Sequence, residues 1–124
     1  MEMIGLGADL VDVDRFRAAL ARRAALAERL FTDAERDYAL GQHDPAMSLA
    51  ARFGAKEAVM KALGVGIGSF ALRDVEVVRA ESGEPSLALT GGAAALASAR
   101  GVRRWMLSLT HTDTTAMAVA VALG

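Results

Sequence analysis

One helical segment near the middle of the chain restricts the fold more than any other feature. The sequence SLAARFGAKEAVMKALG, residues 48–64, predicts a single helix, with Ser48 at its N-cap and Gly64 just past its last turn. At roughly 100° per residue, its larger apolar side chains fall on one arc and its alanines cover the opposite side. Because little of its surface is left for solvent, both sides are expected to pack against other elements.

Four charged side chains interrupt this apolar helix, namely Arg52, Lys56, Glu57 and Lys61. Lys56 falls inside the apolar arc, where a solvated lysine does not belong. Charges on a mostly buried helix need partners such as an opposite charge, a metal ion or an anionic ligand. For Glu57 and Lys61 the simplest alternative is an ordinary pair four residues apart, which contributes about 0.2–0.5 kcal/mol.

The segments around this helix predict an α+β fold with a largely antiparallel sheet and one long packed helix. The expected strands are residues 3–13, 75–79, 86–90, 102–112 and 115–123. The other expected helices are residues 15–23, 24–31, 32–40 and 92–100. We expect Asp14 to cap the first of these helices and a capping box at Thr32 and Glu35 to open the third.

Composition excludes several classes of protein. The 124 residues fit one domain, residues 1–124, and 53% hydrophobic residues with 23% charged residues indicate a folded chain that can self-associate. A net charge of −1 argues against nucleic-acid and membrane-surface binding. The absence of cysteine excludes thiolate zinc sites and cysteine nucleophiles. Because no basic leader and no apolar run of roughly 18 residues occurs, a cytoplasmic location is expected.

An acidic residue in the first strand offers a partner for the charged helix. Asp9 shares a strand face with Gly5 and Gly7, and glycines in a strand mark the close approach of a ligand or of another backbone. Asp9 and Glu57 together can supply two oxygen ligands for Mg²⁺, which prefers carboxylates, waters and phosphates. The alternative is an edge-strand aspartate that points to solvent. Positive charge for phosphate oxygens is available from Arg52, Lys56 and Lys61.

Five short motifs of the chain occur in the order found in one known family. They are GLGADLVDVDRF, FTDAE, LAARFGAKEAVMKALGVGIG, GEP and SLTHT. In this order and spacing the chain resembles the holo-acyl-carrier-protein synthase family, the small bacterial-type 4′-phosphopantetheinyl transferases. The resemblance implies Mg²⁺-dependent transfer of the phosphopantetheine arm of coenzyme A to a serine of an apo acyl carrier protein, with release of adenosine 3′,5′-bisphosphate. It also implies the fold of that family and a homotrimer with active sites between subunits.

The resemblance assigns expected roles to individual residues. Asp9 and Glu57 correspond to the metal-binding carboxylates, and Glu57 and Lys61 to the catalytic pair. Within that pair, Glu57 or a metal-held water accepts the serine proton, and Lys61 stabilises a phosphate oxygen or protonates the leaving group. The residues expected to bind coenzyme A are Arg52, Lys61, Gly64, Gly83, Pro85 and His111. Those expected to receive the carrier protein are Arg15 and Arg22, for which an ordinary solvated helix face is the alternative.

One departure from the family pattern leaves a second function open. Glu84 occupies the middle of the Gly-Glu-Pro turn, where the family has lysine or arginine. The change either weakens the binding of coenzyme A or requires a basic residue from elsewhere in the chain. The alternative function is therefore a non-catalytic homologue that binds coenzyme A or a nucleotide. A third hypothesis is an assembly protein whose charged helix residues pair across subunit contacts.

Overall fold

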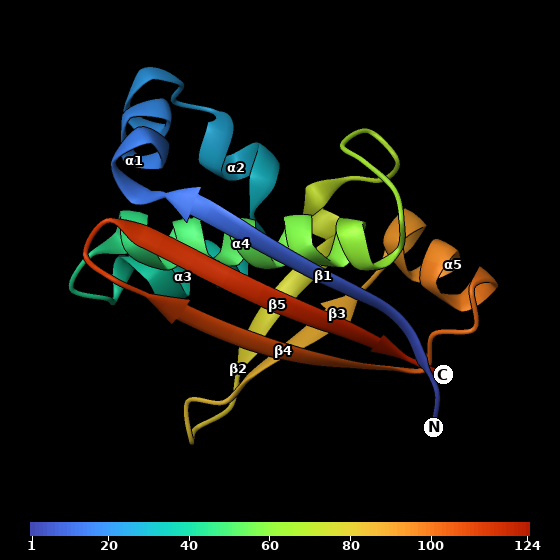
Figure 1. Ribbon diagram of the computed structural model, residues 1–124. Helices are drawn as coiled ribbons and strands as arrows, with labels where there is room; N and C mark the ends of the chain where they lie inside the picture. Colours follow the sequence, from blue (N-terminus) through green and yellow to red (C-terminus); the bar gives the residue numbers. More distant parts are fainter.

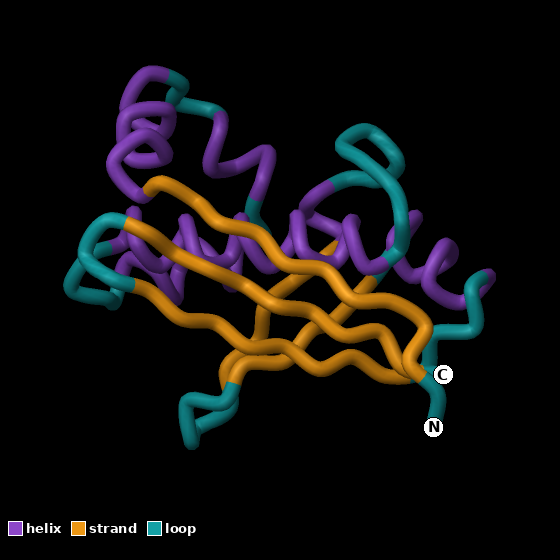
Figure 2. Tube along the Cα trace, viewed as in Figure 1, coloured by secondary structure: helices purple, strands orange, loops and turns teal.

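A three-stranded antiparallel sheet, a long helix across it and a separate two-stranded hairpin form the fold (Figures 1 and 2). The computed structural model describes all 124 residues. In the first sheet, in the order β1-β5-β4, the strands are β1 (Met3–Asp12), β5 (Thr115–Leu123) and β4 (Arg104–His111). The hairpin pairs β2 (Val75–Arg79) with β3 (Pro85–Leu89). The helices are α1 (Val13–Arg22), α2 (Leu26–Leu30), α3 (Asp33–Leu40), α4 (Pro45–Ala62), the short 3-10 helix η1 (Leu72–Asp74) and α5 (Gly91–Ala99).

The predicted α+β class and antiparallel pairing are confirmed, and the bounds of elements other than α4 differ from prediction by at most two residues. The central helix begins earlier than predicted. Asp44 caps it by accepting a hydrogen bond from the Met47 backbone N–H at 3.4 Å, and Pro45 fits the first helical position. Ser48 therefore lies inside the helix. Gly64, with φ of +70°, is confirmed as the residue past its end.

Two predicted caps at the other helices had different outcomes. The capping box is confirmed, because Glu35 N–H donates to Thr32 Oγ1 at 3.2 Å and Thr32 N–H donates to Glu35 Oε1 at 3.0 Å. The prediction of Asp14 as the cap of α1 is wrong. Asp12 takes that place and accepts from the Arg15 backbone N–H at 2.9 Å, because the strand ends one residue earlier, and the helix begins two residues earlier, than the sequence indicated.

Helix α4 packs so closely on the sheet that its backbone touches strand β1. A Cβ atom at Gly7 would lie 1.9 Å from the carbonyl oxygen of Ala58, and one at Gly5 would lie 1.9 Å from that of Ala62. The glycines of β1 therefore make room for another backbone, which decides between the two explanations that the sequence left open. The residues of β5 that face the helix are fully buried alanines, Ala116, Ala118, Ala120 and Ala122.

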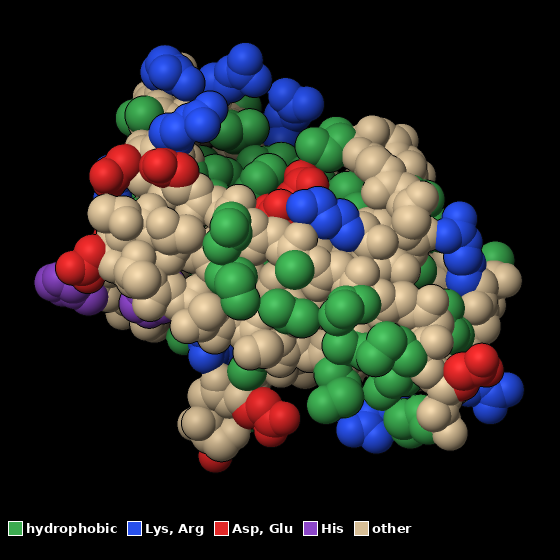
Figure 3. Space-filling model, viewed as in Figure 1, with side chains coloured by type: hydrophobic (Ala, Val, Ile, Leu, Met, Phe, Trp, Pro, Cys, Tyr) green, Lys and Arg blue, Asp and Glu red, His purple; other side chains and the backbone are tan.

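The opposite face of the sheet is open and apolar. We call it the outer apolar face and define it by Leu6, Leu10, Met106 and Met117, which are between 36% and 67% exposed. In Figure 3 hydrophobic side chains gather over β1, β5 and β4. A contiguous apolar surface of this kind marks a site of protein contact. None of the helices has the length and apolarity that crossing a bilayer requires.

Candidate functional site

Three charged side chains meet where the C-terminal half of α4 passes the edge strand β1. Lys61 Nζ lies 3.0 Å from Asp9 Oδ1 and donates a second hydrogen bond of 3.0 Å to the Ala8 carbonyl. The Asp9 side chain is 16% exposed, so the alternative in which it points into solvent is wrong. Lys61 pairs with Asp9 rather than with its helix neighbour Glu57. We call Asp9, Glu57 and Lys61 the carboxylate centre.

Glu57 lacks a partner at this centre. Its Oε1 atom is buried and accepts no hydrogen bond. Burial, and to a smaller extent the charge of Asp9, raises the pKa of Glu57, while Lys61 lowers it. An ionised carboxylate in such a place needs more positive charge than one lysine supplies, and a divalent cation would provide it.

The donors at the carboxylate centre fit magnesium better than zinc. No group of three or more histidine, cysteine, aspartate or glutamate side chains in the structure could hold a metal ion, so a closed zinc site is not formed. Mg²⁺ usually keeps several waters and binds only one or two protein carboxylates. Asp9 and the unpartnered oxygen of Glu57 are such a set.

A second polar region is a cavity of about 470 Å³. It opens between α3, the first turns of α4, the end of β2 and the β4–β5 turn. Basic and imidazole side chains line it, and we call it the basic cavity: Arg52, Arg79, His43 and His111. No residue of the carboxylate centre lines this cavity.

Arg52 is the buried cation of the basic cavity. It is 2% exposed, its Nη1 donates to Ser48 Oγ at 2.9 Å, and its guanidinium lies 4.2 Å from the centroid of the Tyr38 ring. Its Nε has no partner, and it forms no salt bridge. Burial, followed by repulsion from Arg79, lowers the pKa of Arg52. A buried guanidinium without a carboxylate is well placed to bind an anion such as a phosphate.

The structure separates the residues expected to bind coenzyme A. Arg52 and His111 line the basic cavity, whereas Lys61 belongs to the carboxylate centre. The three remaining expected residues line neither the basic cavity nor the shallow cavity beside α1, and they are Gly64, Gly83 and Pro85. The last two lie at the β2–β3 turn and at the start of β3. Within one chain, neither of these cavities contains all six residues.

Sequence reasoning missed Arg79, and among the partners that it left open for Lys56 the structure selects an opposite charge. Arg79 ends β2, lines the basic cavity and donates to the Gly83 carbonyl at 2.6 Å. The hairpin that carries Glu84 therefore also supplies an arginine, which the alternation along a five-residue strand does not single out. Lys56 is fully buried against Glu35, so it is not available to a phosphate.

The predicted docking arginines lie beside a third region. Arg15 and Arg22 border a shallow cavity of about 530 Å³ whose other walls include Leu10, Phe16 and Phe53. Both arginines are exposed on α1, over which Figure 3 shows a gathering of basic side chains. Positive charge around an apolar floor suits a partner with an acidic, amphipathic surface.

Comparison with known proteins gives consistent results over nearly the whole chain. The model of the 4′-phosphopantetheinyl transferase superfamily matches residues 5–120. A holo-[acyl-carrier-protein] synthase of Streptomyces avermitilis is 48% identical over 124 residues, which is 100% of both chains. One from Caldanaerobacter subterraneus is 40% identical over 121 residues, covering 98% of this chain and 95% of the relative.

Solved structures show the same similarity. The crystal structure of holo-[acyl-carrier-protein] synthase from Neisseria meningitidis has a TM-score of 0.91 at 29% identity, with 99% of this chain and 100% of that chain covered. A holo-(acyl-carrier-protein) synthase from Bacillus anthracis in complex with CoA (3′,5′-ADP) has a TM-score of 0.80 at 30% identity. That comparison covers 97% of this chain and 96% of the other.

Proposed function

The chain belongs to the 4′-phosphopantetheinyl transferase superfamily, and from this premise we propose that it transfers the 4′-phosphopantetheine arm of coenzyme A to a serine of an apo acyl carrier protein. The products are the holo carrier protein and adenosine 3′,5′-bisphosphate. The observation that carries the proposal is the carboxylate centre, in which Lys61 lies 3.0 Å from Asp9 and one oxygen of Glu57 has no partner. Relatives named for this activity at 40% and 48% identity support it.

Asp9 and Glu57 would hold Mg²⁺ through the oxygens that are free or shared with Lys61. When bound, the metal ion neutralises charge on the diphosphate that is cleaved. Lys61 would then leave Asp9 and direct its ammonium at a phosphate oxygen of the departing bisphosphate. Its 54% exposed side chain leaves room for that movement.

Glu57 is the residue we assign as general base. The serine nucleophile comes from the carrier protein, so this chain needs only to accept the hydroxyl proton. Burial raises the pKa of Glu57 in the metal-free chain, and a bound cation would lower it, so the assignment rests on the unpartnered oxygen of Glu57 at the carboxylate centre. Arg15 and Arg22 would orient the acidic carrier protein beside α1.

Coenzyme A would place the phosphate that is not part of its diphosphate at the basic cavity, where Arg52 and Arg79 supply positive charge and His111 a hydrogen-bonding ring nitrogen. Because this cavity and the carboxylate centre are separate in one chain, we infer active sites between subunits, in the homotrimer that the family resemblance implies. The outer apolar face supplies a surface for that association, since its leucine and methionine side chains are exposed in the single chain.

Mass spectrometry of an apo carrier protein, incubated with this chain, Mg²⁺ and coenzyme A, tests the proposal. We expect the carrier mass to increase by one phosphopantetheine arm. A carrier whose target serine is replaced by alanine serves as the control and should stay unchanged. Tight binding of coenzyme A without any mass increase on a panel of apo carriers would instead favour the non-catalytic binding homologue.

A further inference from the structure

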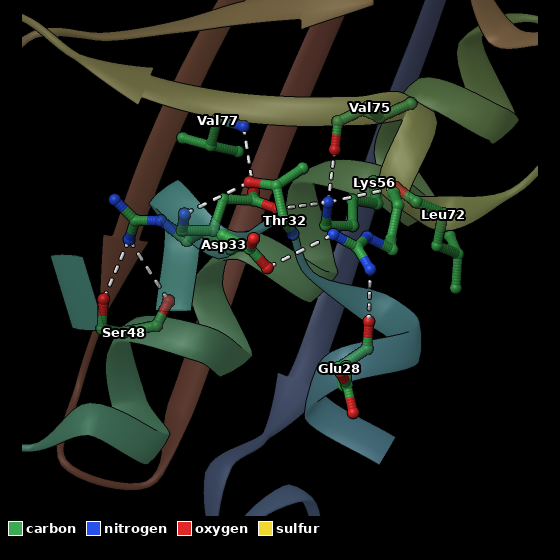
Figure 4. A network of polar contacts seen from close by, with 11 residues as sticks. Glu28, Thr32, Asp33, Ser48, Lys56, Leu72, Val75 and Val77 are labelled. Carbon is green, nitrogen blue, oxygen red and sulfur yellow. Dashed lines mark hydrogen bonds and ion pairs between the residues drawn. The ribbon is translucent and has the colours of Figure 1, made fainter. Parts of the chain in front are cut away.

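A fully buried lysine–glutamate pair joins the β2–β3 hairpin to two helices (Figure 4). The side chains of Lys56 and Glu35 are both 0% exposed, and Nζ lies 2.7 Å from Oε1. Lys56 also donates to the carbonyl of Leu72, at 3.0 Å, and to the carbonyl of Val75. Glu35 Oε2 accepts from the Val77 backbone N–H at 3.0 Å. Two side chains thus connect α3, α4, η1 and β2.

Every polar atom of the pair already has a hydrogen-bond partner within the chain. An ammonium has three hydrogens, and Lys56 directs them to Glu35, Leu72 and Val75. Glu35 Oε1 accepts a further bond from Thr32, and Oε2 is used by β2. Burial lowers the pKa of Lys56, and the charge of Glu35 opposes that shift. Because every polar atom is paired, the role of the pair is to hold elements together.

The hairpin depends on this attachment more than an ordinary sheet strand would. β2 and β3 pair only with each other, and an isolated two-stranded hairpin is at best marginally stable. Near the surface, Arg73 adds bonds to the Glu28 carbonyl at 3.2 Å and to Asp33 at 3.5 Å, but exposed pairs of this kind contribute little. The buried pair, the packing of Val75 and Val77 on α4 and the packing of β3 beside β4 together set the orientation of the hairpin.

The other end of β2 reaches the basic cavity. β2 runs from Val75, which the Lys56–Glu35 pair anchors, to Arg79, which lines the cavity. β2 has only five residues, and Glu35 bonds its middle residue, Val77, so loss of the pair would release the strand within two residues of Arg79. Lys56 and Glu57 are neighbours in sequence but point in directions roughly 100° apart on the helix. Loss of the pair should therefore disturb the hairpin more than the carboxylate centre.

We propose that Lys56 and Glu35 are positioning residues for coenzyme A binding, because they fix the β2–β3 hairpin on α4 and so hold Arg79 at the basic cavity. The identification of coenzyme A as the ligand rests on the proposed function. The attachment of the hairpin is a property of the free chain and is measured without any ligand.

The first experiment is Lys56→Met, which keeps the length of the side chain and removes all its donors. We expect the KM for coenzyme A to rise about tenfold while kcat changes less than about twofold. Amide hydrogen exchange of the free protein should become faster in residues 75–89. Glu35→Gln, of equal size, should act in the same direction, and it carries the test if Lys56→Met does not fold.

The matched control is Leu49→Ala, which opens a cavity in the other core cluster and leaves the hairpin contacts intact. It should lower stability without changing the KM for coenzyme A or exchange within residues 75–89. Arg79→Gln tests the route of the effect. If Lys56 acts through Arg79, adding Lys56→Met to Arg79→Gln should raise the KM little further.

The outcomes separate this inference from the proposed function. Unchanged exchange of residues 75–89 in both Lys56→Met and Glu35→Gln overturns the inference, whatever the activity. Faster exchange with an unchanged KM, or full additivity with Arg79→Gln, overturns the role assigned to Arg79. A wild-type chain that modifies no carrier protein contradicts the proposed function alone, because the exchange experiment still reports on the attachment.

Discussion

Helix α4 carries two lysine–carboxylate pairs that differ in how completely they are satisfied. Lys56 and Glu35 are both 0% exposed and use every donor and acceptor. Lys61 and Asp9 are 54% and 16% exposed, and Glu57 beside them keeps a buried oxygen without a partner. The same two residue types therefore serve different purposes on one helix.

The difference shows that burial and complete hydrogen bonding distinguish structural charges from functional ones. Removing one partner of a buried pair leaves an uncompensated charge, so such a pair contributes cohesion. A partly exposed group with an unpaired buried oxygen lowers the stability of the free chain. That stability is recovered when a ligand supplies the missing partner. Whether each polar atom already has a hydrogen-bond partner, rather than how many charges are present, indicates which lysine can take part in chemistry.

The largest expected effect comes from breaking the fully buried pair of Lys56 and Glu35. Glu35→Ala should lower the free energy of unfolding by about 3–5 kcal/mol, because it leaves Lys56 buried without its counter-charge. Asp9→Asn, the corresponding change in the partly exposed pair of Lys61 and Asp9, should lower the free energy of unfolding by less than about 1 kcal/mol. Urea unfolding of both variants at pH 7 measures the difference. Equal losses in the two variants would contradict the contrast between the pairs.

The next effect separates activity from stability at the carboxylate centre. Glu57→Gln should slow transfer by at least about 10²- to 10³-fold, as expected when a group that stabilises developing charge or moves a proton is lost. Its unfolding free energy should stay the same or rise, because an unpaired, partly buried charge is removed. Transfer rates by mass spectrometry and thermal unfolding in metal-free buffer test both parts. Full activity in this variant would exclude Glu57 from the mechanism.

The two pairs also differ in how far the sequence predicts them. Asp9 and Glu57 lie within recognisable motifs of a strand and a strongly patterned helix, so their meeting with Lys61 could be expected. The partner of Lys56 could not, because Glu35 is 21 residues away and its capping-box role already explains its presence. The second contact of Glu35, to Val77 of β2, depends on a tertiary arrangement that the local sequence pattern does not predict.

The same limit applies to the basic cavity and to the helix starts. Arg79 lies at the end of a short strand where alternation does not distinguish cavity from solvent. At the start of α4, Asp44 and Ser48 are both competent caps, and only the packing of the preceding loop decides between them. Long, strongly patterned elements were thus predictable, and the contacts that join distant elements were not.

A smaller effect is expected at Lys61, whose ammonium occupies Asp9 in the free chain. Lys61→Met should tighten Mn²⁺ binding in the absence of coenzyme A by about tenfold, because one competing cation is removed from the carboxylates. The same variant should bind coenzyme A more weakly, since a phosphate partner is lost. Electron paramagnetic resonance of free Mn²⁺ measures the first change. Lys61→Arg keeps the charge and should show no tightening, so equal tightening in both variants would argue against competition.

The smallest effect is expected at an ion pair whose carboxylate is more exposed to solvent than those of the two lysine–carboxylate pairs. Arg17 donates two bonds to Asp44, at 2.8 and 2.9 Å, and these bonds lower the pKa of Asp44 to about 2. Asp44→Asn keeps an equally good helix cap and removes the charge together with one of the two acceptors for Arg17, so it should cost less than about 1 kcal/mol at pH 7.

The pH dependence of that cost identifies its origin. The pKa of Asp44 in the folded chain, about 2, lies below its ordinary value of 3.8, so the carboxylate stabilises the fold above about pH 4 and loses this contribution as the pH falls towards 2. The difference in unfolding free energy between wild type and Asp44→Asn should therefore shrink over that range in urea titrations. A difference that stays constant down to pH 2 would show that asparagine disturbs the cap itself, and the exposed pair would then contribute no measurable charge effect.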